Sequence, residues 1–215
     1  IKGLKKYTNN ITAIVNMAED NSVTAENISR KELSALPYGE IKESIIALSD
    51  KENLMRNLFY WQFNNERLKN LNFGDIYLEA MNEMFESTSV GLKKSTEILN
   101  ITGQVLPATL DKITICAELE DGTTVEGKEK IPQVTYSKIT KIKRIYNSPS
   151  NCQPAPGVIE AIQDADAIII GPGSLYTDVL PNLLVKNVSK AIKESKALKF
   201  YITNIMTEPG QTDNY

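Results

Sequence analysis

The sequence predicts an α/β fold with a mainly parallel sheet and a small antiparallel excursion. Apolar residues recur at helical spacing between residues 38 and 100, the middle third alternates apolar and polar residues, and the last third alternates strand and helix patterns. A chain of 215 residues is long enough for one sizeable core. We therefore expect a single domain over residues 1–215, with the antiparallel excursion at about 112–146.

The first element is a buried strand over residues 11–15, "ITAIV". It gives way to the polar Asn16 and to an acidic pair, Glu19 and Asp20. These acids are expected just beyond the carboxyl end of the strand.

Helices follow. The spacing over residues 38–63 predicts two amphipathic helices that are separated near Ser49 and Asp50, and further helices are predicted over 73–85 and 89–100. Their aromatic and methionine side chains are interpreted as core.

The middle third carries the hairpin signal Asp121-Gly122 between two alternating segments. Residues 114–146 are therefore expected to be mainly antiparallel. A basic run accompanies the expected last strand, and it fits a solvated strand face better than an anion site. The run consists of Lys138, Lys141, Lys143 and Arg144.

In the last third, a helix over 156–163 leads to a strand over 167–170, then to a helix over 188–196 and a second strand over 199–205. Both strands are apolar enough to be buried on both faces. Such a crossover unit is right-handed with parallel strands, so both strands end at the same edge of the sheet.

The segment "GPGS", residues 171–174, follows the first of these strands. Gly171 and Gly173 allow the backbone to approach a phosphate closely, Pro172 stiffens the turn, and Ser174 is a good helix N-cap. Anion binding and a plain structural turn explain this loop about equally well. The second strand ends in "TNIMTEPGQTDNY", whose many hydrogen-bonding side chains favour a ligand site over a capped surface loop. With Asn16, three strand ends are expected to line one crevice.

Composition limits the function classes. A net charge of −3 gives no reason to expect nucleic acid or an anionic membrane as partner, and no apolar run approaches the roughly 20 residues of a membrane span. The cytoplasm is the expected location.

Cys116 and Cys152 show no pattern of a disulfide framework or a zinc site. The chain has no histidine, which excludes serine-histidine and cysteine-histidine hydrolases within it. Catalysis would depend on carboxylates, lysines, magnesium or the phosphates of the substrate.

Several motifs together resemble a known family. "ADAIIIGPGSLYTDVLPNLLV", "YITNIMTEPGQTDNY", "GQVLPATLDKITICAELEDGTTVEGKEKIP" and "GLKKYTNNITAIVNMAED" are similar, in order and over almost the whole chain, to the gluconeogenesis-factor branch of the 2-phospho-L-lactate transferase family. The resemblance implies a three-layer α/β sandwich with a Rossmann-like parallel sheet.

The resemblance also implies a function. The family has two branches: cytoplasmic regulators of carbon metabolism and cell shape that bind UDP-sugars, and phospholactyl transferases that use a guanosine-activated donor and magnesium. The residues in the motifs of this chain are more similar to those of the regulator branch. A regulator is therefore expected rather than an enzyme. Asp20 is the candidate carboxylate for any magnesium ion. The residues implied to line the nucleotide site are Gly171, Gly173, Ser174, Tyr176, Asn182, Asn204, Thr207 and Gly210.

The chain departs from the family pattern at several loops. It begins after the family's first strand and glycine-rich loop and stops at Tyr215, before the family's C-terminal elements. It has "NSVTAENIS" for a glycine-serine loop, "PYGEIKES" for a proline-proline-glycine-aspartate turn, and "NLNFGD" for a glycine-histidine-serine-phenylalanine-glycine-asparagine turn. These changes leave open a third hypothesis, a homologue that keeps the fold without the ligand. A missing first strand would also leave a sheet edge that invites association, so a homo-oligomer is expected.

Overall fold

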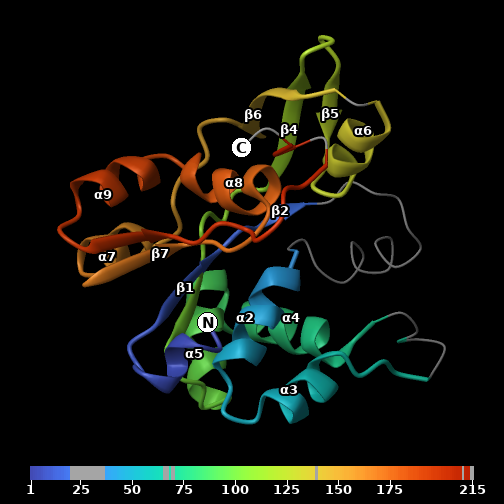
Figure 1. Cartoon of the computed structure of the whole chain (residues 1–215). Coiled ribbons are helices and arrows are strands. Elements are labelled where there is room, and N and C mark those ends of the chain that lie inside the picture. Colours follow the sequence, from blue (N-terminus) through green and yellow to red (C-terminus); the bar gives the residue numbers. More distant parts are fainter. Residues whose placement is uncertain (20–36, 65–67, 69–70, 139, 210, 214–215) are drawn as a thin grey trace. The chain divides into compact units, whose positions relative to one another are not determined.

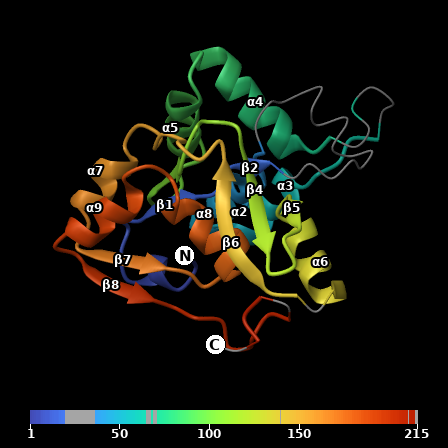
Figure 2. The same ribbon diagram turned by 90° about the horizontal axis from the view of Figure 1, so that it is seen from above.

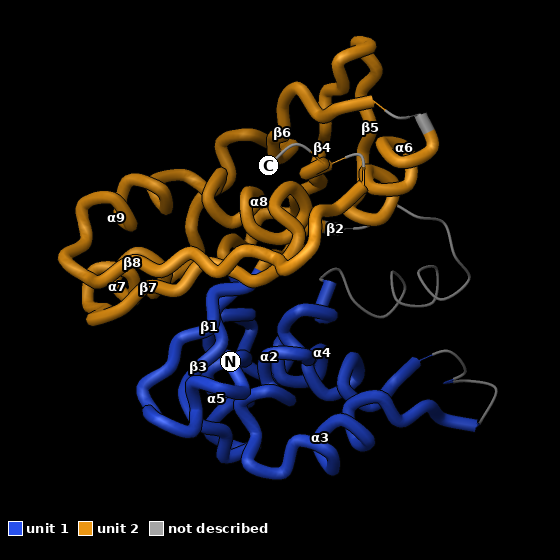
Figure 3. Tube along the Cα trace, in the orientation of Figure 1, with its two compact units in different colours: residues 1–15, 23–107 blue, residues 16–22, 108–215 orange. Residues whose placement is uncertain are grey.

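The computed structural model describes residues 1–19, 37–64, 68, 71–138, 140–209 and 211–213. The chain divides into two compact units (Figure 3). Unit 1 comprises residues 1–15 and 23–107, and unit 2 comprises residues 16–22 and 108–215. The single domain expected from the sequence stays a prediction.

Unit 1 is mainly helical (Figure 1). A short 3-10 turn, η1 (Leu4–Lys6), precedes β1 (Thr12–Val15), which pairs in parallel with β3 (Gln104–Pro107), so that Thr12 lies opposite Gln104. The helices among the described residues of this unit are α2 (Gly39–Leu48), α3 (Glu52–Phe59), α4 (Phe73–Phe85) and α5 (Thr88–Ile98). The first strand and all four helices lie where the apolar spacing predicted them.

The core of unit 1 forms around α2, whose Ile41, Ile45, Ile46 and Leu48 are fully buried. Phe59 at the end of α3 is also fully buried.

A buried ion pair lies in the same core. Lys42 Nζ lies 2.6 Å from Asp75 Oδ1 and donates to Asn72 Oδ1 at 3.1 Å, and only 2% of the Lys42 side chain is exposed. Asn72 also caps α4 by accepting from the Asp75 N–H. The buried Lys42 charge is thus paired with two oxygen atoms, as a buried charge requires.

Unit 2 contains a mixed sheet around β4 (Ile113–Leu119). β4 pairs in parallel with β2 (Ala18–Glu19) and antiparallel with β5 (Thr124–Glu126) and β6 (Ile142–Ser148). Figure 2 shows β4 and β6 running in opposite directions. The β4–β5 hairpin turns at Asp121-Gly122, as predicted.

A helix, α6 (Lys130–Lys138), interrupts the expected antiparallel excursion. The expectation of strands up to Tyr146 was wrong here, because Ile131 and Thr135, one turn apart, bury their side chains as a helix face. Pro132 is tolerated in the first turn, where its missing N–H has no helical partner to lose. Lys138 is therefore the last residue of a helix, while Lys143 on β6 pairs across the sheet with Glu118 at 2.6 Å.

The remaining elements of unit 2 form a parallel pair with short helices. These are α7 (Val158–Gln163), β7 (Ala167–Ile170), the π-helical segment η2 (Leu175–Val179), α8 (Leu180–Leu183), α9 (Val188–Glu194) and β8 (Leu198–Tyr201). β7 and β8 pair in parallel, as predicted.

The expectation that these two strands are buried on both faces was wrong. β8 is exposed along its length and β7 is at most half-buried. Within the part of the chain that the structure describes, each pairs only with the other, so neither has the second neighbour and the two covered faces of a central strand. The α/β class, with parallel sheets and a small antiparallel sheet, is confirmed.

Candidate functional site

The loop after β7 is fixed against the residue that follows β8. Gly171 has φ +81° and is joined to Pro172 by a cis peptide bond. A Cβ atom at Gly171 would lie 2.5 Å from the Ile202 carbonyl oxygen. Only glycine combines this positive φ with so close an approach, so the residue type determines how the loop leaves the sheet.

Two consecutive backbone N–H groups of this loop hold side-chain oxygens. Gly173 N–H donates to Asn204 Oδ1 at 3.2 Å, and Ser174 N–H donates to Asp178 Oδ2 at 2.9 Å. The Asp178 carboxylate also lies 2.7 Å from Lys128 Nζ. The loop therefore already binds one anionic oxygen with its backbone, and a lysine provides the counter-charge.

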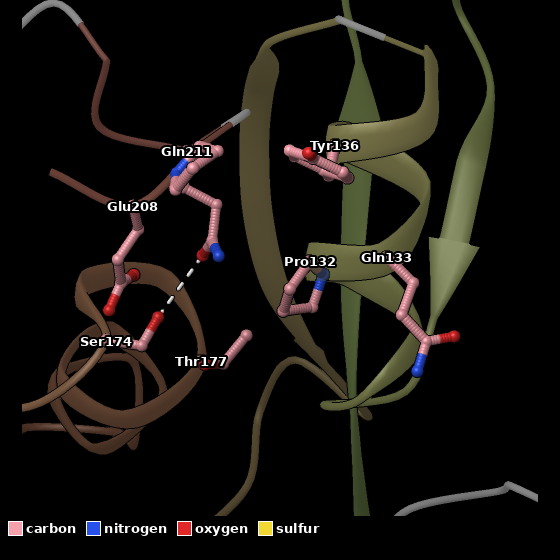
Figure 4. Close-up of a pocket in the computed structure, with 8 residues that line it drawn as sticks. Pro132, Gln133, Tyr136, Ser174, Thr177, Glu208 and Gln211 are labelled. Atoms are coloured by element: carbon pink, nitrogen blue, oxygen red, sulfur yellow. Dashed lines mark hydrogen bonds between the residues drawn. The ribbon is translucent and has the colours of Figure 1, made fainter.

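The segment after β8 closes onto the same loop. Asn204 Nδ2 donates to Glu208 Oε1 at 2.9 Å, and the Ser174 hydroxyl donates to Gln211 Oε1 at 3.2 Å (Figure 4). The Glu208 N–H in turn donates to Thr212 Oγ1 at 2.7 Å. The carboxyl ends of β7 and β8 thus meet through side-chain hydrogen bonds, as expected for neighbouring parallel strands.

Asn16 and Asn182 support the helical turns behind the loop. Asn16 Nδ2 donates to the Thr177 carbonyl at 3.3 Å, and Asn182 Nδ2 donates to the Asp178 carbonyl at 2.8 Å. Both hold η2 in place.

A pocket of about 480 Å³ opens between this loop and α6, within unit 2 (Figure 4). This volume lies in the range of small-molecule sites. The residues that line it are Pro132, Gln133, Tyr136, Ser174, Thr177, Glu208, Pro209 and Gln211.

The residues predicted for the site fall into three groups. Gly173, Ser174 and Asn204 are joined by hydrogen bonds directly or through Glu208 and Gln211, and Gly171 fixes their loop. Of these four, Ser174 lines the described pocket. Tyr176, Asn182 and Thr207 form the second group, which like Gly171, Gly173 and Asn204 is absent from that lining. The third group, Asp20 and Gly210, lies outside the described residues.

Sequence reasoning missed one wall of the pocket altogether. Pro132, Gln133 and Tyr136 lie on α6, which was read as part of the strand region. The pair Ile131 and Thr135 at helical spacing was the available signal. Asp178 and Lys128 were also missed, because an ion pair across 50 residues leaves no local pattern.

The described residues contain no group of three or more Cys, Asp or Glu side chains placed to hold a metal ion. In that part of the chain no helix has the length and apolarity needed to cross a membrane. Cys116 and Cys152 are buried free thiols, and burial raises the pKa of both, which keeps them protonated.

The motifs and the fold agree with a family assignment made on the sequence. A sequence model of the 2-phospho-L-lactate transferase CofD family matches residues 1–215. The chain belongs to this family.

Relatives place this CofD-family chain with the gluconeogenesis factors. It is 41% identical to the gluconeogenesis factor of Halalkalibacterium halodurans over 216 residues and 39% identical to that of Bacillus subtilis. Both alignments cover 100% of this chain, but only 65% of the first relative and 66% of the second. Of a further relative in Clostridium acetobutylicum, 43% identical, it covers 47%. The chain therefore spans about half to two thirds of the relatives it matches.

A solved structure supports the fold. The crystal structure of a protein from Bacillus halodurans, 41% identical, superposes on the whole chain with a TM-score of 0.86, and 67% of that protein is covered. The resemblance read from the motifs is confirmed.

Proposed function

We propose that this chain binds a nucleotide sugar of the UDP-sugar type and acts as a regulatory protein of carbon metabolism and cell shape, as the resemblance to the gluconeogenesis factors implies. The observation that carries the proposal is the loop over residues 171–174, whose Gly173 and Ser174 N–H groups face side-chain oxygens beside a pocket.

The loop is suited to a diphosphate by its chemistry. Phosphate oxygens would take the places of Asn204 Oδ1 and Asp178 Oδ2 on the two N–H groups, and Lys128 would pair with the phosphate charge. In this exchange phosphate oxygens replace one amide oxygen and one carboxylate oxygen.

The family model favours a second candidate, a transferase that uses a guanosine-activated donor and magnesium. The regulator ranks first because the loops changed from the family pattern are those expected around an enzyme's substrate. A homologue without ligand binding is the third outcome.

Thermal unfolding with UDP-N-acetylglucosamine, UDP-glucose, GDP and GTP, each with and without magnesium, separates the three. A ligand at about 100 times its Kd adds roughly 2.7 kcal/mol, which for this chain length raises Tm by about 5–10 °C. We expect the shift with UDP-sugars. A shift confined to guanosine nucleotides with magnesium would favour the transferase, and no shift with any of them would favour the third hypothesis.

Two variants test the placement of the site. Gly173→Val would place a Cβ 3.2 Å from the Asp178 carboxylate, and Asn204→Ala removes the oxygen on the Gly173 N–H. Gly173→Val should weaken UDP-sugar binding about tenfold or more, whereas Asn204→Ala should strengthen it, because the phosphate no longer has to displace the amide oxygen. The control Lys94→Ala, which removes an exposed ion pair in unit 1, should leave UDP-sugar binding unchanged. Unchanged binding by both site variants would reject this loop as the nucleotide site.

A further inference from the structure

The two walls of the unit 2 pocket differ in chemistry. On the α6 side, Pro132 and Tyr136 lie one turn apart and therefore share a face of the helix. The Tyr136 side chain is 68% exposed. Figure 4 shows both rings on this side, opposite Ser174, Glu208 and Gln211. One wall thus offers ring surfaces and the other offers hydrogen-bonding groups.

The charge of the pocket disfavours a phosphate as its occupant. None of the eight described lining residues carries a positive charge, and Glu208 contributes a carboxylate. A phosphate there would face a like charge with no lysine or arginine in the lining. A neutral group therefore suits this lining better than a phosphate, whereas the loop N–H groups proposed to bind the phosphates have Lys128 nearby, 2.7 Å from Asp178.

Glu208 indicates what kind of neutral group fits. Its Oε1 accepts from Asn204, whereas its Oε2 is buried and has no hydrogen-bond partner among the described residues. An ionised carboxylate can only accept, so this oxygen needs a donor. A buried acceptor without a donor is costly, and a ligand hydroxyl would satisfy it.

We propose that this pocket is the subsite for the sugar ring of the nucleotide sugar. The inference rests on the proposed function, in which the phosphates bind at Gly173 and Ser174. The apolar face of a hexose packs on the Tyr136 ring, and one of its hydroxyl groups donates to Glu208 Oε2. The amides of Gln133 and Gln211 also belong to residues that line the pocket.

The same groups fit a uracil ring less well. Uracil presents one N–H between two carbonyl oxygens, so a carboxylate facing that edge meets two acceptors for one donor. A hexose presents several hydroxyl groups, each of which can donate to a carboxylate. The carboxylate therefore favours the sugar over the base.

Calorimetric titration of the 215-residue chain with UDP and with UDP-glucose tests this assignment. We expect the wild type to bind UDP-glucose more tightly than UDP. Tyr136→Ala should lower the affinity for UDP-glucose about tenfold, toward that for UDP, and leave UDP binding unchanged. Tyr136→Phe should keep the wild-type affinity, and Glu208→Gln should weaken UDP-glucose binding about fivefold and UDP binding by a smaller factor.

Tyr7→Ala is the matched control, because Tyr7 is an exposed tyrosine of unit 1, 89% accessible, and its removal should change neither affinity. Circular dichroism and Tm would verify that each variant folds. A parallel loss of UDP and UDP-glucose binding in Tyr136→Ala would place the base in the pocket and overturn the proposal. Wild-type affinities in both Tyr136→Ala and Glu208→Gln would overturn it as well. Wild-type protein that binds neither ligand would instead reject the proposed function and, with it, the subsite.

Discussion

Unit 1 buries a lysine, an asparagine and an aspartate in its core, whereas unit 2 leaves the hydrogen-bonded pair Asn204 and Glu208 at the loop beside its pocket. Lys42, Asn72 and Asp75 are at most 5% exposed as residues. In unit 2, Asn204 is exposed and Glu208 is half-buried. Polar residues near a loop can thus serve the fold or remain available to a ligand, and the depth of burial of the whole residue distinguishes the two cases here.

This difference explains one of the departures from the family pattern. Asn72 and Asp75 belong to the "NLNFGD" turn, where the family has serine and asparagine. Here Asn72 caps α4 and Asp75 pairs with Lys42. Residues 71–75 of this turn lie in the core of unit 1, so Asn72 and Asp75 have a structural role in this chain.

The largest expected effect tests that conclusion. Lys42→Met leaves the Asp75 carboxylate buried without its cation, which should cost about 3–5 kcal/mol of unfolding free energy. Urea unfolding followed by the fluorescence of Trp61, the single tryptophan, which lies in unit 1, would measure it.

The double variant Lys42→Met, Asp75→Leu is the control. Removing both charges should recover most of the lost stability, because an apolar pair of similar volume is often neutral in such a position. A single variant as stable as the wild type would show that the pair is solvated and that unit 1 is no more closed than unit 2.

The next effect concerns the loop of unit 2. Gly171 and Gly122 have nearly the same φ, +81° and +82°, but a Cβ at Gly122 would meet no atom within 4 Å. Gly122→Ala should therefore cost about 1 kcal/mol for the left-handed backbone alone. Gly171→Ala should cost about 2–3 kcal/mol, since it adds a collision with the Ile202 carbonyl.

Far-UV circular dichroism in urea would compare the two glycine variants, and titration with UDP-glucose would compare their ligand binding. Only Gly171→Ala should weaken binding. Equal losses of stability in both variants would mean that the loop does not pack against the end of β8 as described.

The sequence carried most of the secondary structure because that information is local. The helical spacing over residues 38–63 and the Asp121-Gly122 turn each report on side chains within a few positions of each other. Helix α6 was missed because Pro132 and the β-branched Val134 and Thr135 are more typical of a strand or turn than of a helix. The burial of both Ile131 and Thr135, which are four residues apart, is the observation that indicates a helix.

The candidate site could be predicted only in part. Gly171, Gly173, Ser174 and Asn204 follow two strands whose parallel pairing makes their ends neighbours, so the sequence was enough to group them. The α6 wall of the pocket and the Lys128–Asp178 ion pair join segments far apart along the chain. Their meeting depends on how the antiparallel sheet and the β7–β8 pair pack, which no local pattern encodes.

The smallest expected effect concerns the exposed strand. Phe200 on β8 is 50% exposed, whereas Phe59 in unit 1 is fully buried. Phe59→Ala should cost about 3–5 kcal/mol, and Phe200→Ala about 1 kcal/mol or less, because half of the ring is already in water. Equal costs would mean that β8 is covered in solution. Sedimentation at several protein concentrations would then show what covers the strand. If a second copy of this chain covers it, dilution should separate the copies and lower the cost of Phe200→Ala. If the cover lies within the monomer, that cost should not depend on concentration.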